Sequence, residues 1–246
     1  MLNYSEATYA LFLSILLIVA GYQFYFLPQR RPIKKASIGR ETPFDEKFRF
    51  RPQWVWVYSF AYYPYVLSTL LTLSSLTEFY STCASYLALL FSHIVISYFY
   101  PVRTPAEWRS YSASCASSRF LKFIQRIDKG GNCFPSMHVA VATLTAMHIT
   151  ANSYSELGFP IFIVWIFPAL IAVSALYTKQ HFFADIIPGG VLAGVVYCLY
   201  RCVLALLKSD GPNTFLFVAI SLGCCLFFLA RSDLSPVISS KNGQSL

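Results

Sequence analysis

The feature that most constrains this chain is a series of apolar runs separated by short polar stretches. The runs cover residues 7–27, 53–76, 79–102, 135–151, 157–177, 182–207 and 214–230. A helix of about 20 apolar residues crosses the hydrocarbon core of a bilayer, and most of the runs come close to that length or exceed it. Of the 246 residues, 56% are hydrophobic and 12% are charged, which is too apolar for a soluble protein of this size. We therefore predict an all-α fold, a polytopic membrane helix bundle with a six-span core and a seventh C-terminal span.

The domain organisation follows from the same pattern. Residues 1–230 are expected to form one integral membrane domain with its core at about 50–208, followed by a polar, disordered tail over 231–246. The first run lacks a basic leading segment and a small-residue cleavage site, so we interpret it as a retained span. Pro64 and several tyrosines lie within the second run, which we expect to be a kinked helix inside the bundle.

The stretch RFLKFIQRI, residues 119–127, alternates basic and apolar residues at helical spacing. It is expected to be a short helix on the membrane surface, with a solvated connecting loop as the alternative. His93 lies inside the third run, where a hydrogen-bonded interior histidine is favoured over a catalytic one. The seven cysteines show no metal-ligand spacing, and we expect buried free thiols, with a reactive Cys133 as the minor alternative.

Two polar clusters interrupt the apolar chain, and each stands where a run begins or ends. The first is GGNCFPSMH, residues 130–138, and the second is SALYTKQHFFAD, residues 174–185. The chain between them is long enough to cross a bilayer and return, so both clusters can lie at the same membrane face. Together they supply histidines, a carboxylate, a lysine and a serine, which suffice for phosphoryl transfer.

The catalytic candidates in these clusters are His181, His138 and Asp185. His181 and Asp185 are four residues apart, so they share one face of a helix, and the carboxylate can hold one ring nitrogen while the other attacks phosphorus. His138 follows Pro135, which is favourable in the first turn of a helix, and it is placed to protonate the leaving oxygen. Ser136 adds a hydroxyl at a helix N-terminus, where backbone N–H groups attract an anion.

Candidates for binding the substrate phosphate are Lys179, then Arg103 and Arg109, besides Ser136. The alternative interpretation of Lys179, Arg103 and Arg109 is that they are ordinary basic residues that flank membrane spans and bind no substrate. Between Pro101 and Asp185 the acidic residues are too scattered to form a ligand cluster, so we expect no metal and no cofactor.

These clusters resemble the motifs of the type-2 phosphatidic acid phosphatase superfamily. The chain reads Pro135-Ser136-Met137-His138 where the family has a PSGH-like motif, and Ser174, His181 and Asp185 match the spacing of its later motif. Ala175 stands where the family has arginine, and the family's first motif, KxxxxxxRP, is degenerate around Arg103. The stretches YTKQHFFADIIPGG and VWVYSFAYYPY look more like the inositol phosphorylceramide synthase branch. The resemblance covers roughly residues 50–195.

Two classes of function follow. The first is an enzyme that attacks a lipid phosphoester through a phosphohistidine, and either water or an alcohol accepts the phosphoryl group. The second is a non-enzymatic transporter or lipid-binding scaffold on the same fold. In both cases the expected partner is a membrane lipid with a phosphate headgroup. The net charge of +8 suits anionic lipids, and no basic stripe outside the loops indicates nucleic acid.

Two arguments about membrane orientation conflict, and the sequence favours the cytoplasmic face for the site, because the first loop lies outside both clusters and alone carries eight basic residues. With seven spans, the first loop, both clusters and the tail share one face, which carries 17 of the 19 Lys and Arg residues. The positive-inside rule puts that face in the cytoplasm. The family resemblance implies the opposite face, because sites of this family usually face the lumen, periplasm or exterior.

Overall fold

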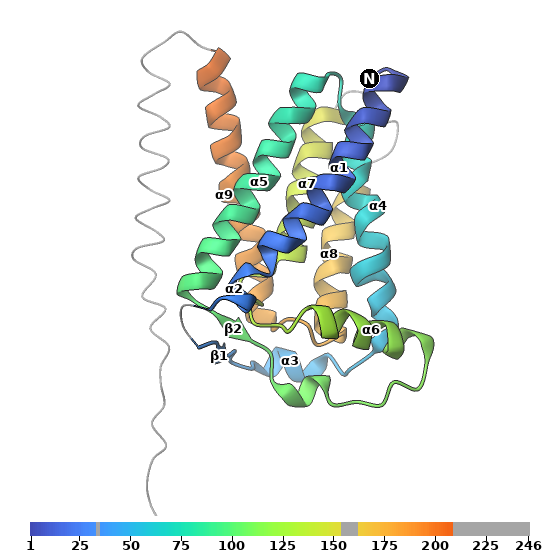
Figure 1. Cartoon of the computed structure of the whole chain (residues 1–246), viewed down its shortest axis with the longest axis vertical. Coiled ribbons are helices and arrows are strands. Elements are labelled where there is room, and N and C mark those ends of the chain that lie inside the picture. Colours follow the sequence, from blue (N-terminus) through green and yellow to red (C-terminus); the bar gives the residue numbers. More distant parts are fainter. Residues whose placement is uncertain (33–34, 154–161, 209–246) are drawn as a thin grey trace, which may run out of the picture. The chain divides into compact units, whose positions relative to one another are not determined.

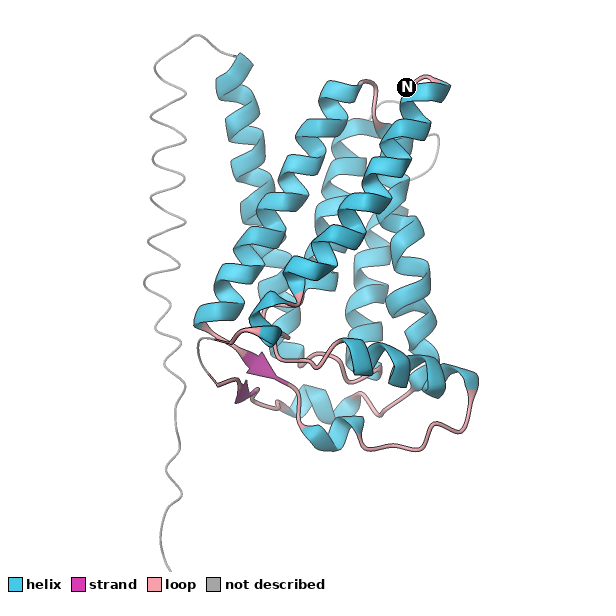
Figure 2. Ribbon diagram, viewed as in Figure 1, coloured by secondary structure: helices cyan, strands magenta, loops and turns pink. Residues whose placement is uncertain are grey.

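The computed structural model describes residues 1–32, 35–153 and 162–208. The chain divides into two compact units, Met1–Tyr197 and Cys198–Leu246, and the second is described only as the end of one helix. The fold is mostly helical (Figures 1 and 2). The α-helices are α1 (Tyr4–Tyr25), α2 (Leu27–Arg30), α3 (Pro43–Lys47), α4 (Tyr62–Leu67), α5 (Leu76–Phe99), α6 (Ala116–Ile127), α7 (Met137–Ser153), α8 (Phe162–Tyr177) and α9 (Phe183–Lys208).

Three helices among the described residues are long and apolar enough to cross a membrane. They are Tyr4–Arg30, Leu76–Phe99 and Phe183–Leu207, and the apolar helix Phe162–Tyr177 is shorter. Asn3 and Ser75 cap the first two, since each side chain accepts a hydrogen bond from the backbone of the glutamate three residues on. These helices are consistent with a membrane protein. The predicted run 214–230 and the predicted tail lie outside the described residues.

The second predicted span is helical without a break over residues 52–72, but its turns are of several types. A 3₁₀ turn at Pro52–Trp54 leads into a π-helical segment at Trp56–Ala61, then into α4, and a second 3₁₀ turn follows at Ser68–Thr72. Pro64 lies in the short α-helical part and cannot donate a backbone hydrogen bond. The π-helical segment places Tyr58 in the interior, where it is 3% exposed.

Helix α7 runs through the centre of the first unit. Its residues Ala140 and Leu144 pack with Leu89 of α5 and with Ala193 and Val196 of α9. Small side chains at two of these positions let the backbones approach closely. Gly189, one turn before Ala193, brings α9 so near the start of α7 that a Cβ there would lie 2.5 Å from the carbonyl oxygen of Ser136. The polar clusters are thus held together by close helix packing.

The first polar loop folds against the segment that follows α5. Strand β1 (Ser37–Ile38) pairs in parallel with β2 (Val102–Arg103). Figure 1 shows both strands, α3 and α6 at the end of the helices where α9 begins. The short helix predicted at residues 119–127 is present within α6, and its place on a membrane surface stays a prediction. Trp56 fixes α6 by stacking on Phe120 and donating to the Ser117 hydroxyl at 2.9 Å. Its Phe123 and Ile127 are exposed.

The cysteines among the described residues are all free thiols, as expected, but few are buried. Cys133 is buried, Cys83 and Cys202 are half-buried, and Cys115 and Cys198 are exposed. The expectation of buried thiols therefore holds fully only for Cys133 within the described part of the chain.

Candidate active site

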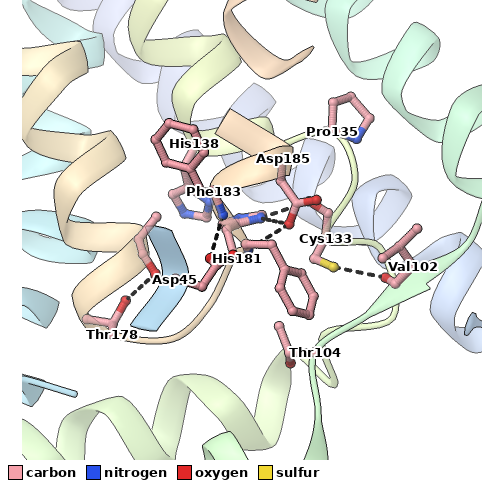
Figure 3. A network of polar contacts seen from close by, with 12 residues as sticks. Asp45, Val102, Thr104, Cys133, Pro135, His138, Thr178, His181, Phe183 and Asp185 are labelled. Carbon is pink, nitrogen blue, oxygen red and sulfur yellow. Dashed lines mark hydrogen bonds and ion pairs between the residues drawn. The ribbon is translucent and has the colours of Figure 1, made fainter. Parts of the chain in front are cut away.

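The two polar clusters meet at the beginnings of α7 and α9. The backbone N–H of Ser136 donates to the carbonyl of Asp185 at 3.0 Å, which joins the clusters directly. Figure 3 shows His138, His181 and Asp185 gathered at this junction, with Cys133 beside them. The three side chains are 9%, 3% and 2% exposed, respectively. The structure thus brings the three predicted catalytic residues together.

His181 is held at one ring nitrogen. Its Nδ1 lies 2.8 Å from the carbonyl oxygen of Cys133, so Nδ1 carries the proton and donates it to that oxygen. In this tautomer the lone pair is on Nε2, and no described residue forms a hydrogen bond with that nitrogen. A backbone carbonyl therefore provides the closest contact of the ring, where the sequence had indicated the carboxylate.

The carboxylate of Asp185 lies farther from the His181 ring than the Cys133 carbonyl does. Its Oδ2 is 3.5 Å from Nδ1 of His181, and the same oxygen accepts the backbone N–H of Phe182 at 2.9 Å. The carboxylate therefore also caps the first turn of α9. A negative charge at 3.5 Å stabilises positive charge on the imidazole even without a short hydrogen bond.

His138 is enclosed by tyrosines. Its Nδ1 is 3.0 Å from the hydroxyl of Tyr58, and the two rings stack with centroids 4.2 Å apart. The ring of Tyr62 lies on it at 4.9 Å. Sequence reasoning did not single out Tyr58, although the tyrosine-rich stretch that contains it was a visible signal.

His93 is buried and hydrogen-bonded, as expected, and its hydrogen-bond partner belongs to the first polar cluster. Its Nε2 donates to the carbonyl of Pro135 at 3.1 Å, and the ring of Tyr25 stacks on it at 5.3 Å. His93 therefore positions the turn that carries Ser136.

Ser136 and Arg109 each carry a buried polar atom with no hydrogen-bond partner among the described residues. These atoms are Oγ of Ser136 and Nη2 of Arg109. The rest of the Arg109 guanidinium donates to the carbonyl of Asp128 at 2.7 Å and to the Thr104 hydroxyl at 3.4 Å. Buried polar groups rarely lack a partner, which makes both atoms candidates for binding a ligand oxygen.

Lys179 and Arg103 point elsewhere. The Lys179 ammonium donates to the backbone carbonyl of Asp45 at 2.9 Å and lies over the Trp108 ring at 4.6 Å. Burial lowers the pKa of Lys179, and the charges of Asp45 and Glu41 offset part of this effect. Arg103 is exposed on β2. The structure shows neither residue in contact with the histidines.

Asp45 is a site-supporting residue that sequence reasoning missed. It is 2% exposed, and its carboxylate accepts the backbone N–H of Phe183 at 2.7 Å, together with the N–H and hydroxyl of Thr42 at 2.7 Å each. Phe44 stacks on Phe183 at 4.9 Å. The pattern Thr-x-x-Asp is a capping signal and predicts the short helix α3, but not its contact with α9.

Cys133 is not placed for thiol chemistry. Its side chain donates to the carbonyl of Val102 at 3.2 Å, and the thiol is buried. Burial, reinforced by the negative charges of Asp185 and Asp128, raises the pKa of the thiol well above its ordinary value. A neutral thiol is a poor nucleophile, so its backbone carbonyl is the part of Cys133 that acts at the site.

Among the described residues, no group of three or more His, Cys, Asp or Glu side chains is arranged so that it could hold a metal ion. The carboxylates nearest the histidines already accept backbone hydrogen bonds.

Comparison with known protein families then gives one result. The sequence profile of the PAP2 superfamily matches residues 44–199. The chain belongs to the PAP2 superfamily. The matched segment contains every predicted site residue, and it excludes α1 and β1. No curated protein and no solved structure gives a significant match. Membership indicates phosphatase or phosphotransferase chemistry on phosphorylated, lipid-like substrates.

Proposed function

We propose that this protein is a membrane enzyme that transfers a phosphoryl group from a lipid phosphoester through a phosphohistidine at His181. The observation that carries the proposal is the geometry of that side chain. Nδ1 is fixed by the Cys133 carbonyl, the carboxylate of Asp185 is 3.5 Å away, and Nε2 is left with its lone pair. An oriented histidine with one nitrogen available is the nucleophile that this chemistry needs.

In the first step, Nε2 of His181 attacks phosphorus, the N–P bond forms, and the P–O bond to the lipid breaks. The positive charge that develops on the imidazole is stabilised by Asp185. His138 gives a proton to the leaving oxygen. His138 gives this proton as an imidazolium. Its Nδ1–H donates to the hydroxyl oxygen of Tyr58, 3.0 Å away, and its Nε2 proton goes to the leaving oxygen, which leaves a neutral ring with a lone pair on Nε2.

In the second step, an acceptor oxygen attacks phosphorus and the N–P bond breaks. His138 takes the proton from the acceptor. If the acceptor is water, the enzyme is a lipid phosphatase. If the acceptor is an alcohol, it is a phospholipid headgroup transferase, as the resemblance to inositol phosphorylceramide synthases implies.

The phosphate oxygens are proposed to bind where buried donors lack partners. Ser136 Oγ stands at the N-terminus of α7, where free backbone N–H groups and the helix dipole favour an anion. Arg109 Nη2 supplies a second donor with full positive charge. Lys179 and Arg103 would raise the local positive potential and attract the substrate from farther away.

The proposal is tested with purified protein in lipid nanodiscs. The wild-type protein is incubated with ³²P-labelled phosphatidic acid or a prenyl diphosphate, and the covalent phosphoenzyme and released phosphate are measured. We expect both in the wild type and neither in His181→Ala. His148→Gln is the matched control, because His148 lies ten residues along α7 from His138, about 15 Å away. Addition of ceramide then distinguishes an alcohol acceptor from water. Binding of these lipids without a phosphoenzyme or turnover would instead indicate a scaffold.

A further inference from the structure

An apolar groove opens beside His138, between α1, α4, α5 and α7. It has a volume of about 170 Å³. Its sides are formed by Leu17, Ile18, Tyr62, Val66, Leu90 and Val141. His138 itself is among the lining residues, so the groove borders the proposed catalytic site.

The groove is as long as one half of a bilayer. On α1 its lining extends from Ser14 to Tyr25, eleven residues at 1.5 Å each, or about 16 Å. The hydrocarbon core is about 30 Å thick, so one leaflet measures about 15 Å. A lipid chain whose phosphate lies at His138 would therefore fill the groove along one leaflet.

The width of the groove fits one chain. A closed cavity of about 150 Å³ holds a benzene molecule, and here 170 Å³ is distributed over the length of a leaflet. Three tyrosines on its sides have hydroxyls that are bonded within the protein. The hydroxyls of Tyr22 and Tyr63 bond each other at 2.7 Å, and that of Tyr86 bonds Thr145 at 2.8 Å. The aromatic rings are left as an apolar surface.

Helix α1 forms one side of the groove, although it lies outside the segment that matches the family. Its contact with α5 is close at Gly21, where a Cβ would be 3.5 Å from Leu90 Cδ2. A larger side chain at Gly21 would therefore project into the groove, since both residues line it.

We propose that this groove binds a single hydrocarbon chain of the phosphate-bearing substrate, and that α1 is the specificity-determining element for that chain. The inference rests on the proposed function, and it adds a substrate class. The preferred substrates carry one long chain on the phosphate, such as a prenyl or single-acyl lipid phosphate. In a diacyl lipid, the second chain remains in the bilayer.

The test compares Gly21→Leu with wild type on two substrates, a long single-chain alkyl phosphate and the chainless para-nitrophenyl phosphate. We expect kcat/KM for the long-chain substrate to fall about tenfold or more, since a single methylene too many in an apolar pocket already has an effect of that size. Hydrolysis of para-nitrophenyl phosphate should be unchanged. Gly190→Leu is the control, because a Cβ at Gly190 would meet nothing within 4 Å. Leu17→Phe places a second obstruction on α1, and it should give the same loss. It keeps the test decisive if Gly21→Leu does not fold.

Two results would overturn the inference. One is equal use of the long-chain substrate by the wild type and both α1 variants. The other is a preference of the wild type for diacyl over single-chain phosphates. Retention of a non-hydrolysable long-chain alkyl phosphonate, measured by native mass spectrometry, reports chain binding separately from turnover. Loss of retention in Gly21→Leu would support the groove even if His181 formed no phosphoenzyme, so the two proposals fail independently.

Discussion

Replacing Asp185 by asparagine isolates the electrostatic part of the proposed mechanism. Asparagine keeps an oxygen that can accept the Phe182 N–H, now bonded at 2.9 Å, and leaves the Cys133 carbonyl on Nδ1 of His181. The change therefore removes a negative charge while it preserves the local hydrogen bonds. Any rate loss then reports the stabilisation of positive charge on the imidazole.

The magnitude follows from the 3.5 Å separation between the carboxylate and Nδ1. With an effective dielectric constant of about 20, a full charge pair at this distance interacts by about 5 kcal/mol. The charge on His181 is only partly developed in the transition state, so about half of this energy or more is expected to be lost. At 1.36 kcal/mol for each factor of ten, kcat should fall roughly 10²- to 10³-fold.

Single-turnover formation of the phosphoenzyme is the assay, because it reports the first step alone. KM should change little, since Asp185 does not face the phosphate in the proposed arrangement. A loss smaller than tenfold, in protein with an unchanged unfolding temperature, would refute the reasoning. The Cys133 carbonyl alone would then be sufficient to activate His181.

Other substitutions and conditions test the rest of the site. His181→Ala should abolish both phosphoenzyme formation and turnover. His138→Ala should slow the release of poor leaving groups far more than the release of para-nitrophenol, and rates measured across a series of leaving groups would show this. Activity should survive incubation with EDTA, because no metal-ligand cluster occurs among the described residues; loss on chelation that Mg²⁺ restores would contradict this. Asp45→Ala leaves the half-buried Phe183 N–H without its acceptor, so the free energy of unfolding should fall by about 1–3 kcal/mol in a denaturant titration. Glu46→Ala, a change at the exposed neighbouring residue, should show no such fall.

The sequence was informative where local spacing determines geometry. His181 and Asp185 stand four residues apart at a helix start, and the two clusters flank runs that return to one face, so their meeting could be predicted. The structure confirms that His138 lies with them (Figure 3). Their catalytic roles, and the role of Ser136, stay predictions.

The sequence was less informative where the outcome depends on contacts between distant segments. Asp45 bonds Phe183, which is 138 residues away, and no local pattern encodes that contact. Lys179 seemed the best phosphate ligand from its position two residues before His181. Its backbone, however, has a φ of 54°, in the left-handed region, and its ammonium binds the Asp45 carbonyl. Sequence distance alone could not predict the direction of that side chain.

The position of the first loop changes the argument about membrane orientation. The positive-inside argument depends on this loop, because it carries eight basic residues and lies outside both polar clusters in the sequence. In the structure, however, β1 pairs with β2, Asp45 caps α9, and Gly39 packs so closely on Phe182 that a Cβ would meet its ring at 2.2 Å. Basic residues on a loop that covers the proposed phosphate site have a second explanation in attraction of an anionic substrate, so they no longer argue for the cytoplasm on their own.

With that argument removed, the orientation implied by the family resemblance prevails, and we expect the site to face away from the cytoplasm. The test is a single cysteine at the exposed Lys35 in an otherwise cysteine-free protein. In sealed vesicles with the cytoplasmic face outward, Lys35→Cys should be protected from an impermeant thiol reagent until detergent is added. Labelling before detergent would place the loop, and the site that it covers, in the cytoplasm. The basic residues of the loop would then follow the positive-inside rule after all.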